Sequence, residues 1–346
     1  MTTSPVTADH DLIASATNRA RGLTEPLLRN IVEALDPSLA AIGCYHFGWQ
    51  TDEPYTAGKA IRPTMAILAA EAVGAPPSAA LPAAAAAELV HNFSLIHDDI
   101  IDSDEQRRGR PSVWKAHGVP AAILIGDALH AAAFEFLLGT GRPNAAAVAE
   151  RLAVAMREIV IGQVQDIEFA GRPWSGPQAV MLDEYQAMAE AKTGALLAFA
   201  AAGGAQLAEA PPSAVRTFDV LGRHLGLAFQ CTDDVLGIWG DPAVTGKPVF
   251  GDLREGKKTL PVIAALATDT PARARLAPLL TEGLRDDAGL RLAAELVEEA
   301  GGRKFAEQEA SRHLTGVGEC LDSLDMPDTV RKSFEALANT LIGRTR

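Results

Sequence analysis

Three carboxylates stand close together in the sequence: Asp98, Asp99 and Asp102. In an α-helix, residues four positions apart are separated by about 40° around the axis and one turn along it, so Asp98 and Asp102 share a face. Such a cluster repels itself unless a cation lies within it. Mg²⁺ suits the cluster because this ion takes oxygen ligands and usually shares them with phosphate oxygens. The stretch therefore predicts a magnesium site.

Two arginines, Arg107 and Arg108, follow these acids within a few residues. Guanidinium groups bind phosphate through charge-assisted hydrogen bonds, so metal ligands followed by this pair indicate a diphosphate substrate. An isolated pattern of this kind describes an exposed acidic helix end and a basic turn equally well. The apolar, helix-forming residues 81–96 that precede it argue against a solvated charge run.

A second acidic stretch repeats the pair as Asp233 and Asp234, with Gly237 where a matching third acid would stand. Two acidic helices that face each other could hold metal ions between them and neutralise a diphosphate. The alternative is a helix end with exposed acids. The segment that follows contains Lys247 and Lys257 among glycines, and it reads either as a mobile loop that closes over an anion or as a solvated surface loop.

Further basic residues could form a second anion site that needs no metal. Lys59 and Arg62 lie one helical turn apart and would act with His91 and Arg108. Taken singly, they would more often be surface charges and a packed histidine. Lys192 lies between apolar helical segments, where it could either meet a phosphate or extend its amine to solvent.

The chain has no nucleophile elbow, dinucleotide fingerprint or phosphate-binding Walker loop. The chemistry with adequate ingredients is metal-assisted departure of diphosphate. Magnesium, lysine and arginine would stabilise the charge on the leaving group. Apolar walls would keep water away from the resulting carbocation.

The elements that position these residues are predicted to be helices, because alanine is abundant and alternating β-branched runs are nearly absent. Before the first acids, Leu89, Phe93, Ile96 and Ile100 follow helical spacing, while His91 and the acids share a second face that would border a cavity. Further helices are expected over residues 120–139, 145–170, 181–208, 212–240 and 258–268, with breaks at Gly/Pro clusters.

Residues 1–20 are polar and predict a flexible tail, and residues 21–346 predict a single helical domain. The net charge is −13 with no basic run, so nucleic acid is not an expected partner. Three cysteines without metal-like spacing predict reduced thiols in a cytoplasmic protein. No signal peptide is expected, and the longest apolar stretch, residues 194–207, is too short to span a membrane.

Taken in order, these motifs resemble the trans-polyprenyl diphosphate synthase family, from Gly58 to Lys258. The matching segments are Gly58-Lys59, Asp98–Asp102, Arg107–Gly109, Gly126-Asp127, Gly162-Gln163, Lys192-Thr193, Phe229–Asp234, Gly246-Lys247 and Asp252-Leu253. The resemblance implies an all-α fold, the isoprenoid synthase type I helical bundle around a central cavity. It also implies a homodimer and three Mg²⁺ ions per active site, held between the two acidic helices.

The resemblance also implies roles for individual residues. The metal ligands would be Asp98, Asp102 and Asp233, with Asp99 and Asp234 assisting through water or outer contacts. The allylic diphosphate would meet Arg107, Lys192, Gln230, Lys247 and Lys257, with Thr193 near the reacting centre. Isopentenyl diphosphate would meet Lys59, Arg62, His91 and Arg108. Two departures, Ala60 in place of an arginine and Gly237 in place of an aspartate, put secondary ligands in doubt.

The implied reaction joins isopentenyl diphosphate to an allylic diphosphate: dimethylallyl, geranyl or farnesyl. Diphosphate leaves the allylic substrate with help from magnesium, the alkene attacks the cation, and the departed diphosphate takes the proton.

Product length depends on the residues just before the first acids. Phe93 resembles the bulky floor of geranylgeranyl-forming relatives, and the small Ser94 argues against an earlier stop at farnesyl. A helical wheel places Ser94, not Phe93, directly beneath Asp98, so ordinary core packing of Phe93 is the alternative.

Three hypotheses follow. The leading one is a synthase that ends at geranylgeranyl diphosphate, with farnesyl or longer polyprenyl products as alternatives within the family. The second is a class I terpene cyclase on the same fold, which would not need the isopentenyl site. The third is a non-catalytic partner subunit, which would not need to keep its acids.

Overall fold

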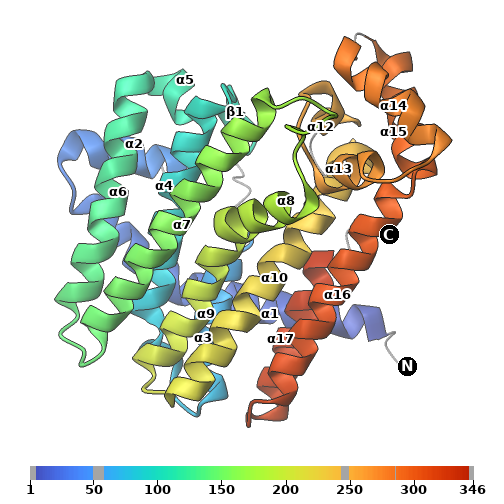
Figure 1. The fold of residues 1–346 in the computed structure, drawn as a ribbon. Coiled ribbons are helices and arrows are strands. Elements are labelled where there is room, and N and C mark those ends of the chain that lie inside the picture. The colour runs from blue at the N-terminus through green and yellow to red at the C-terminus, as the bar shows by residue number, and fades with distance from the viewer. Residues whose placement is uncertain (1–4, 50–57, 243–248, 285, 343–346) are drawn as a thin grey trace. The chain divides into compact units, whose positions relative to one another are not determined.

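The computed structural model describes residues 5–49, 58–242, 249–284 and 286–342. These residues are almost entirely helical (Figure 1), which confirms the predicted all-α class. Within the described ranges, strands occur as one short antiparallel pair, β1 (Gln106–Arg107) and β2 (Arg110–Pro111). Contacts divide the chain into two compact units built from interleaved segments.

The first unit consists of Met1–Met156, Phe199–Asp219 and Leu324–Phe334. Its helices are α1 (Pro5–Glu33), α2 (Pro37–Phe47), α3 (Ile61–Ala72), the short 3₁₀ turn η1 (Pro77–Ala79), α4 (Leu81–Ile101), α5 (Val113–His117) and α6 (Val119–Gly139). Helix α4 packs against both α3 and α6. Five consecutive alanines, residues 83–87, are fully buried in α4, so this segment is enclosed on all sides and its small side chains allow neighbouring helices to approach.

The second unit consists of Arg157–Ala198, Val220–Ser323 and Glu335–Arg346. It contains α8 (Leu182–Ala189), the π-helical turn η2 (Glu190–Gly194), α12 (Gly251–Arg254), α13 (Leu260–Leu266), α14 (Pro271–Glu282), α15 (Asp287–Glu299) and α16 (Gly302–Asp322). Helix α13 packs on α16, and α14 pairs with α15 (Figure 1). Four helices contribute to both units: α7 (Ala145–Gly171), α9 (Ala195–Leu207), α10 (Pro212–Trp239) and α17 (Asp328–Ile342).

Residues 5–20, for which the sequence predicted a flexible tail, lie within helix α1. Ile13, Ala16 and Ala20 are buried, so their helical spacing gives this segment an apolar face despite its polar composition. The expected single domain is divided between the two units. The helix expected over residues 181–208 is interrupted by η2.

The sequence predicted no membrane-spanning segment, but helix α6 is long and apolar enough to be a candidate. Its mean hydropathy of 1.7 and its length meet what a membrane span requires, as core helices of soluble proteins also do. Part of its apolar surface is exposed in the structure: Val119, Ile123, Leu124 and Leu138.

Candidate functional site

The first acidic stretch lies at the end of α4. The Asp102 N–H donates to the Asp98 carbonyl at 2.8 Å, so these two acids lie one turn apart, with Asp102 exposed and Asp98 half-buried. Asp99 is only 1% exposed. Its Oδ1 accepts hydrogen bonds from Nε and Nη2 of Arg107, and its Oδ2 is buried without a hydrogen-bond partner among the described residues. Burial raises the pKa of Asp99, and Arg107 opposes that rise.

Arg107 and Arg108, which follow the first acidic stretch, lie on a tight hairpin. Arg108 and Gly109 connect β1 to β2 with φ angles of 54° and 78°. Positive φ at both central residues is typical of the type I′ turn that joins two-residue hairpins. Arg107 contacts Asp99, whereas Arg108 lies beside Gly58, where an added Cβ would be 3.1 Å from its Nη2. The turn therefore directs two adjacent arginine side chains to different neighbours, Arg107 to Asp99 and Arg108 to Gly58.

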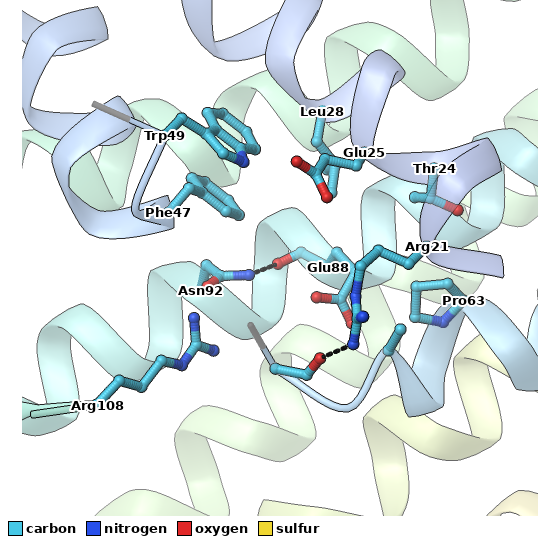
Figure 2. Close-up of a pocket in the computed structure, with 12 residues that line it drawn as sticks. Arg21, Thr24, Glu25, Leu28, Phe47, Trp49, Pro63, Glu88, Asn92 and Arg108 are labelled. Carbon is cyan, nitrogen blue, oxygen red and sulfur yellow. Dashed lines mark hydrogen bonds between the residues drawn. The ribbon is translucent and has the colours of Figure 1, made fainter. Parts of the chain in front are cut away.

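A pocket in the first unit lies beside Arg108 (Figure 2). It is lined by residues from α1, α2, α3 and α4 and the loop before α3: Arg21, Thr24, Glu25, Leu28, Phe47, Trp49, Gly58, Ala60, Pro63, Glu88, Asn92 and Arg108. Arg21 donates to the Gly58 carbonyl at 2.6 Å and so anchors the loop that carries Lys59. Figure 2 shows the side chain of Arg108 directed toward Asn92 and Glu88.

The residues predicted for isopentenyl diphosphate are only partly brought together by this loop and α4. Lys59 is exposed, and among the described residues no hydrogen bond or ion pair holds its amine near the others. Burial lowers the pKa of Arg62 and lowers that of His91 well below its usual range, and the charges of Arg62 and Arg108 add to the effect on His91. Arg62 Nε is buried without an acceptor among the described residues. A buried guanidinium nitrogen without an acceptor favours an anionic ligand.

Two neighbouring groups were not predicted from the sequence. Glu88 lies three residues before His91, and burial raises its pKa while Arg62 and Arg108 lower it. Asn92 is 1% exposed and binds the buried His46 ring nitrogen through Oδ1 at 3.0 Å. Helical spacing from His91 could have pointed to Glu88, but no sequence signal relates His46 to Asn92.

In the second unit, the π turn η2 carries Lys192 and Thr193. Single π turns within helices occur frequently at functional sites. Close packing around this turn depends on glycines. A Cβ at Gly162 would lie 2.5 Å from Lys192 N, and a Cβ at Gly226 would lie 2.5 Å from the Gly194 Cα. Lys192 Nζ pairs with Asp166 at 2.5 Å, which gives that acid a contact the sequence alone did not assign.

Thr193 begins a hydrogen-bond chain that ends at the second acidic stretch. Its Oγ1 donates to Gln230 Oε1 at 2.8 Å, and Gln230 Nε2 donates to Asp234 Oδ1 at 2.8 Å. Asp234 Oδ2 accepts from the Tyr185 hydroxyl and from the Leu260 N–H at 2.7 Å. Burial raises the pKa of Asp234 to about 7, against the effect of these donors. Asp234 thus joins α8, α10 and the start of α13.

The remaining predicted residues of this unit are less constrained. Asp233 is half-buried on α10. Lys257 is exposed and pairs with Glu255 at 2.7 Å. Lys247 lies outside the described residues. The buried Nε2 of Gln163, a residue without an assigned role, lacks a partner among the described residues.

The donor set fits a hard dication that is shared with phosphate. Among the described residues, no three acidic, histidine or cysteine side chains converge into a complete metal site. Mg²⁺ does not require one, because it usually binds one or two carboxylates together with waters and substrate phosphate oxygens. Asp98 and Asp102, one turn apart, offer such a pair, and Asp233 offers a carboxylate in the other unit.

The predicted floor residue, Phe93, lies against α6. Its ring centroid is 4.8 Å from that of His97 and 5.5 Å from that of His130, with the latter pair stacked. The His97 Nε2–H donates to the Ile123 carbonyl at 3.2 Å. This approach requires Gly126, where a Cβ would lie 2.2 Å from His97 Nε2. Ser94 Oγ bonds the His91 carbonyl at 2.9 Å.

Comparison with known proteins agrees with these features. The polyprenyl synthetase family model matches residues 52–297. The (2E,6E)-farnesyl diphosphate synthase of Mycobacterium tuberculosis is 43% identical over 333 residues, 94% of this chain and 91% of that protein. The geranylgeranyl diphosphate synthase of the same organism is 41% identical over 330 residues, 93% of each chain.

A crystal structure of a polyprenyl synthetase from Streptomyces coelicolor A3(2) has 45% sequence identity and a TM-score of 0.88. The match covers 95% of this chain and 99% of that chain. The agreement of sequence, fold and motif order is far beyond coincidence. The chain belongs to the polyprenyl synthetase family and is a prenyltransferase of isoprenoid biosynthesis.

Proposed function

We propose that this protein condenses isopentenyl diphosphate with an allylic diphosphate in head-to-tail fashion and ends at geranylgeranyl diphosphate. The observation that carries the two-substrate part of the proposal is the hairpin at Arg108-Gly109. It directs Arg107 to the first acidic stretch and Arg108 to the pocket beside Gly58. Two diphosphates require two anion sites, whereas a cyclase would need only one.

In this reaction, the side chains bind and orient. Arg107, Lys192 and Lys257 would hold the allylic diphosphate by charge-assisted hydrogen bonds, as would Lys247. Asp98 and Asp102 in the first unit and Asp233 in the second would each serve as Mg²⁺ ligands, and bound Mg²⁺ would neutralise charge on the leaving group. Arg62 and Arg108 would hold isopentenyl diphosphate.

The Gln230–Asp234 contact fixes Thr193 in place, where it would border the reacting centre. Apolar side chains around the reacting groups would keep water from the cation. Departed diphosphate would take the proton, so the chain needs no dedicated base.

Product length is proposed from Phe93. Its ring contacts the rings of His97 and His130, and we propose that this aromatic group forms the floor that stops chain growth. The relatives include farnesyl and geranylgeranyl synthases at similar identity, so a farnesyl or longer product is the alternative.

The test is a purified-enzyme assay with Mg²⁺, isopentenyl diphosphate and each of four starters: dimethylallyl, geranyl, farnesyl and geranylgeranyl diphosphate. Products are separated by chain length. The proposal expects geranylgeranyl diphosphate to accumulate and not to be elongated. Release of hydrocarbon without use of isopentenyl diphosphate would indicate a cyclase. A lack of turnover with all four starters would indicate a non-catalytic subunit.

The floor is tested separately by Phe93→Ala. Removal of the ring opens space beside His130, so products should lengthen by one or more isoprene units. Phe218→Ala is the control, because Phe218 is an aromatic residue that packs on Phe334 in the core and not near His130. If both variants give the wild-type product, Phe93 is a core residue and the floor lies elsewhere.

We also propose a homodimer formed through the exposed apolar face of α6: Val119, Ile123, Leu124 and Leu138. A second copy would bury this surface. Leu124→Glu should convert the dimer to monomer in sedimentation or light-scattering measurements.

We propose a cytoplasmic location as well. The three cysteines, Cys44, Cys231 and Cys320, are buried and unpaired, in keeping with this location.

A further inference from the structure

Arg223, on α10, joins two carboxylates in the second unit. Its Nη1 donates to Glu158 Oε2 on α7 at 3.0 Å and to Glu190 Oε1 at 3.2 Å. All three side chains are half-buried, so solvent and salt screen these ion pairs less than pairs on the open surface. Without the guanidinium, the two carboxylates would face the same point and repel each other. None of these three side chains has a role in the proposed reaction.

Glu190 is the residue at which the π turn η2 begins. The Ala195 N–H donates to the Glu190 carbonyl, which closes the turn. A π turn holds one residue more than an α turn, so a return to α geometry would rotate the residues beyond it by about 100° around the axis. Lys192 and Thr193 lie within the turn, and the direction of their side chains therefore depends on its register.

One face of α10 holds this turn. Arg223, Gly226 and Gln230 follow each other three and four residues apart, which places them on one side of the helix. Gly226 lies against the end of the turn, where an added Cβ would be 2.5 Å from the Gly194 Cα, and Gln230 binds Thr193. Arg223 contacts the beginning of the turn. The same face of α10 therefore holds the turn at both ends.

We propose that Arg223 is a positioning residue for the allylic diphosphate: by holding Glu190, it keeps the π turn in the register that directs Lys192 toward that diphosphate. This inference rests on the proposed function, because the role of Lys192 is part of it. The alternative is that Arg223 only joins α7 to α10 through Glu158 and stabilises the fold. The two roles differ in what the loss of each carboxylate should change.

Steady-state kinetics separate these roles. Arg223→Gln should lower kcat/KM for the allylic diphosphate by about 10–100-fold, since a displacement of about 1 Å can cost about 100-fold. KM for isopentenyl diphosphate should not change, because Arg62 and Arg108 lie in the first unit. Arg223→Lys keeps the positive charge and should recover part of the loss. Arg151→Gln is the matched control and should leave both KM values unchanged, because Arg151 joins α7 to α10 through Asp219 at 2.7 Å within the first unit.

A double-mutant cycle is the decisive test. Glu190→Gln weakens the contact with the turn and should reproduce the loss seen in Arg223→Gln, whereas Glu158→Gln should cause a smaller one. The variant with both Arg223→Gln and Glu190→Gln should lose no more than either single variant, because the two residues act through one contact. Additive losses would overturn the proposal, and so would a wild-type kcat/KM for the allylic substrate in Glu190→Gln. Thermal unfolding identifies variants that have not folded, and if Arg223→Gln is one of them, the result for Glu190→Gln decides.

A measurement without turnover separates this inference from the proposed function. Calorimetry with inorganic pyrophosphate and Mg²⁺ should show weaker pyrophosphate binding in Arg223→Gln than in the wild type, with Lys192→Gln as the positive control. If this result is obtained and the wild type elongates no starter, the proposed function fails while the role of Arg223 in diphosphate binding stands. If the wild type elongates a starter and Arg223→Gln binds pyrophosphate as the wild type does, the inference fails and the proposed function stands.

Discussion

Two histidines in the second unit predict how stability responds to acid. His224 Nδ1 and His313 Nδ1 are 2.9 Å apart, between α10 and α16. Arg312 Nη2 lies 3.1 Å from His313 Nε2 and can only donate, so His313 Nε2 must accept. Neutral His313 therefore carries its proton on Nδ1 and donates it to His224. If His224 Nδ1 also carried a proton, its N–H would point at the Nδ1–H of His313, and the two donors would repel each other.

The size of the effect follows from the pKa of His313. Burial lowers this pKa to about 4, and the charge of Arg312 acts in the same sense. The unfolded value is about 6.5. Because the folded pKa is the lower one, the unfolded chain binds more protons between these values. The contribution to stability is therefore complete above pH 6.5 and is lost as the pH falls toward 4. Linkage gives a loss of about 2 kcal/mol at pH 5 for this one group.

The assay compares urea unfolding of the wild type and His313→Gln at pH 8 and pH 5. Groups outside the pair titrate in both proteins, so the difference between the two proteins reports on the His224–His313 pair, with His313 as its most shifted member. The wild type should lose about 2 kcal/mol more than the variant between the two pH values. His117→Gln, at an exposed histidine, should lose as much as the wild type. Equal losses in the wild type and His313→Gln would refute the argument.

Other predictions follow from single contacts. Gly222→Ala would place a Cβ 2.4 Å from a backbone carbon of α9, so thermal unfolding should show a loss of about 1–3 kcal/mol; Gly318→Ala, with nothing within 4 Å, should be neutral or slightly stabilising. Tyr185→Phe removes a buried donor to Asp234 and should cost about 1–3 kcal/mol in denaturant unfolding; no loss would mean that the remaining donors suffice. Arg21→Ala releases the loop before α3, so KM for isopentenyl diphosphate should rise while KM for the allylic substrate stays constant; an equal rise in both would contradict a local role.

Much of the fold could be predicted because its signals are local. The alanine-rich stretch that leads to Asp98 has the period of a helix, and α4 contains it, with Asp102 as the residue that ends the helix. The family and the all-α class, inferred from motif order, are confirmed. The roles of individual site residues remain predictions.

What the sequence could not supply depends on contacts between distant segments. Asp233 and Asp234 are adjacent and chemically identical in the sequence. Yet Tyr185 and the start of α13 engage Asp234, from segments that are remote along the chain. Likewise, the bond from Arg21 to the loop before α3 spans 37 residues. The π turn at Lys192 was not predicted, and Gly162 and Gly226, which pack closely against it, lie on other helices.

The interleaving of the two units affects how the chain can fold during synthesis. The first unit includes Leu324–Phe334, close to the carboxyl end, and the second begins at Arg157. Both units contain residues beyond position 323, so neither is complete until those residues have left the ribosome. The first unit therefore cannot fold completely before the second is synthesised. Helices of an unfinished chain would expose apolar faces during that interval. Truncation before residue 324 should therefore yield aggregated protein rather than a folded half.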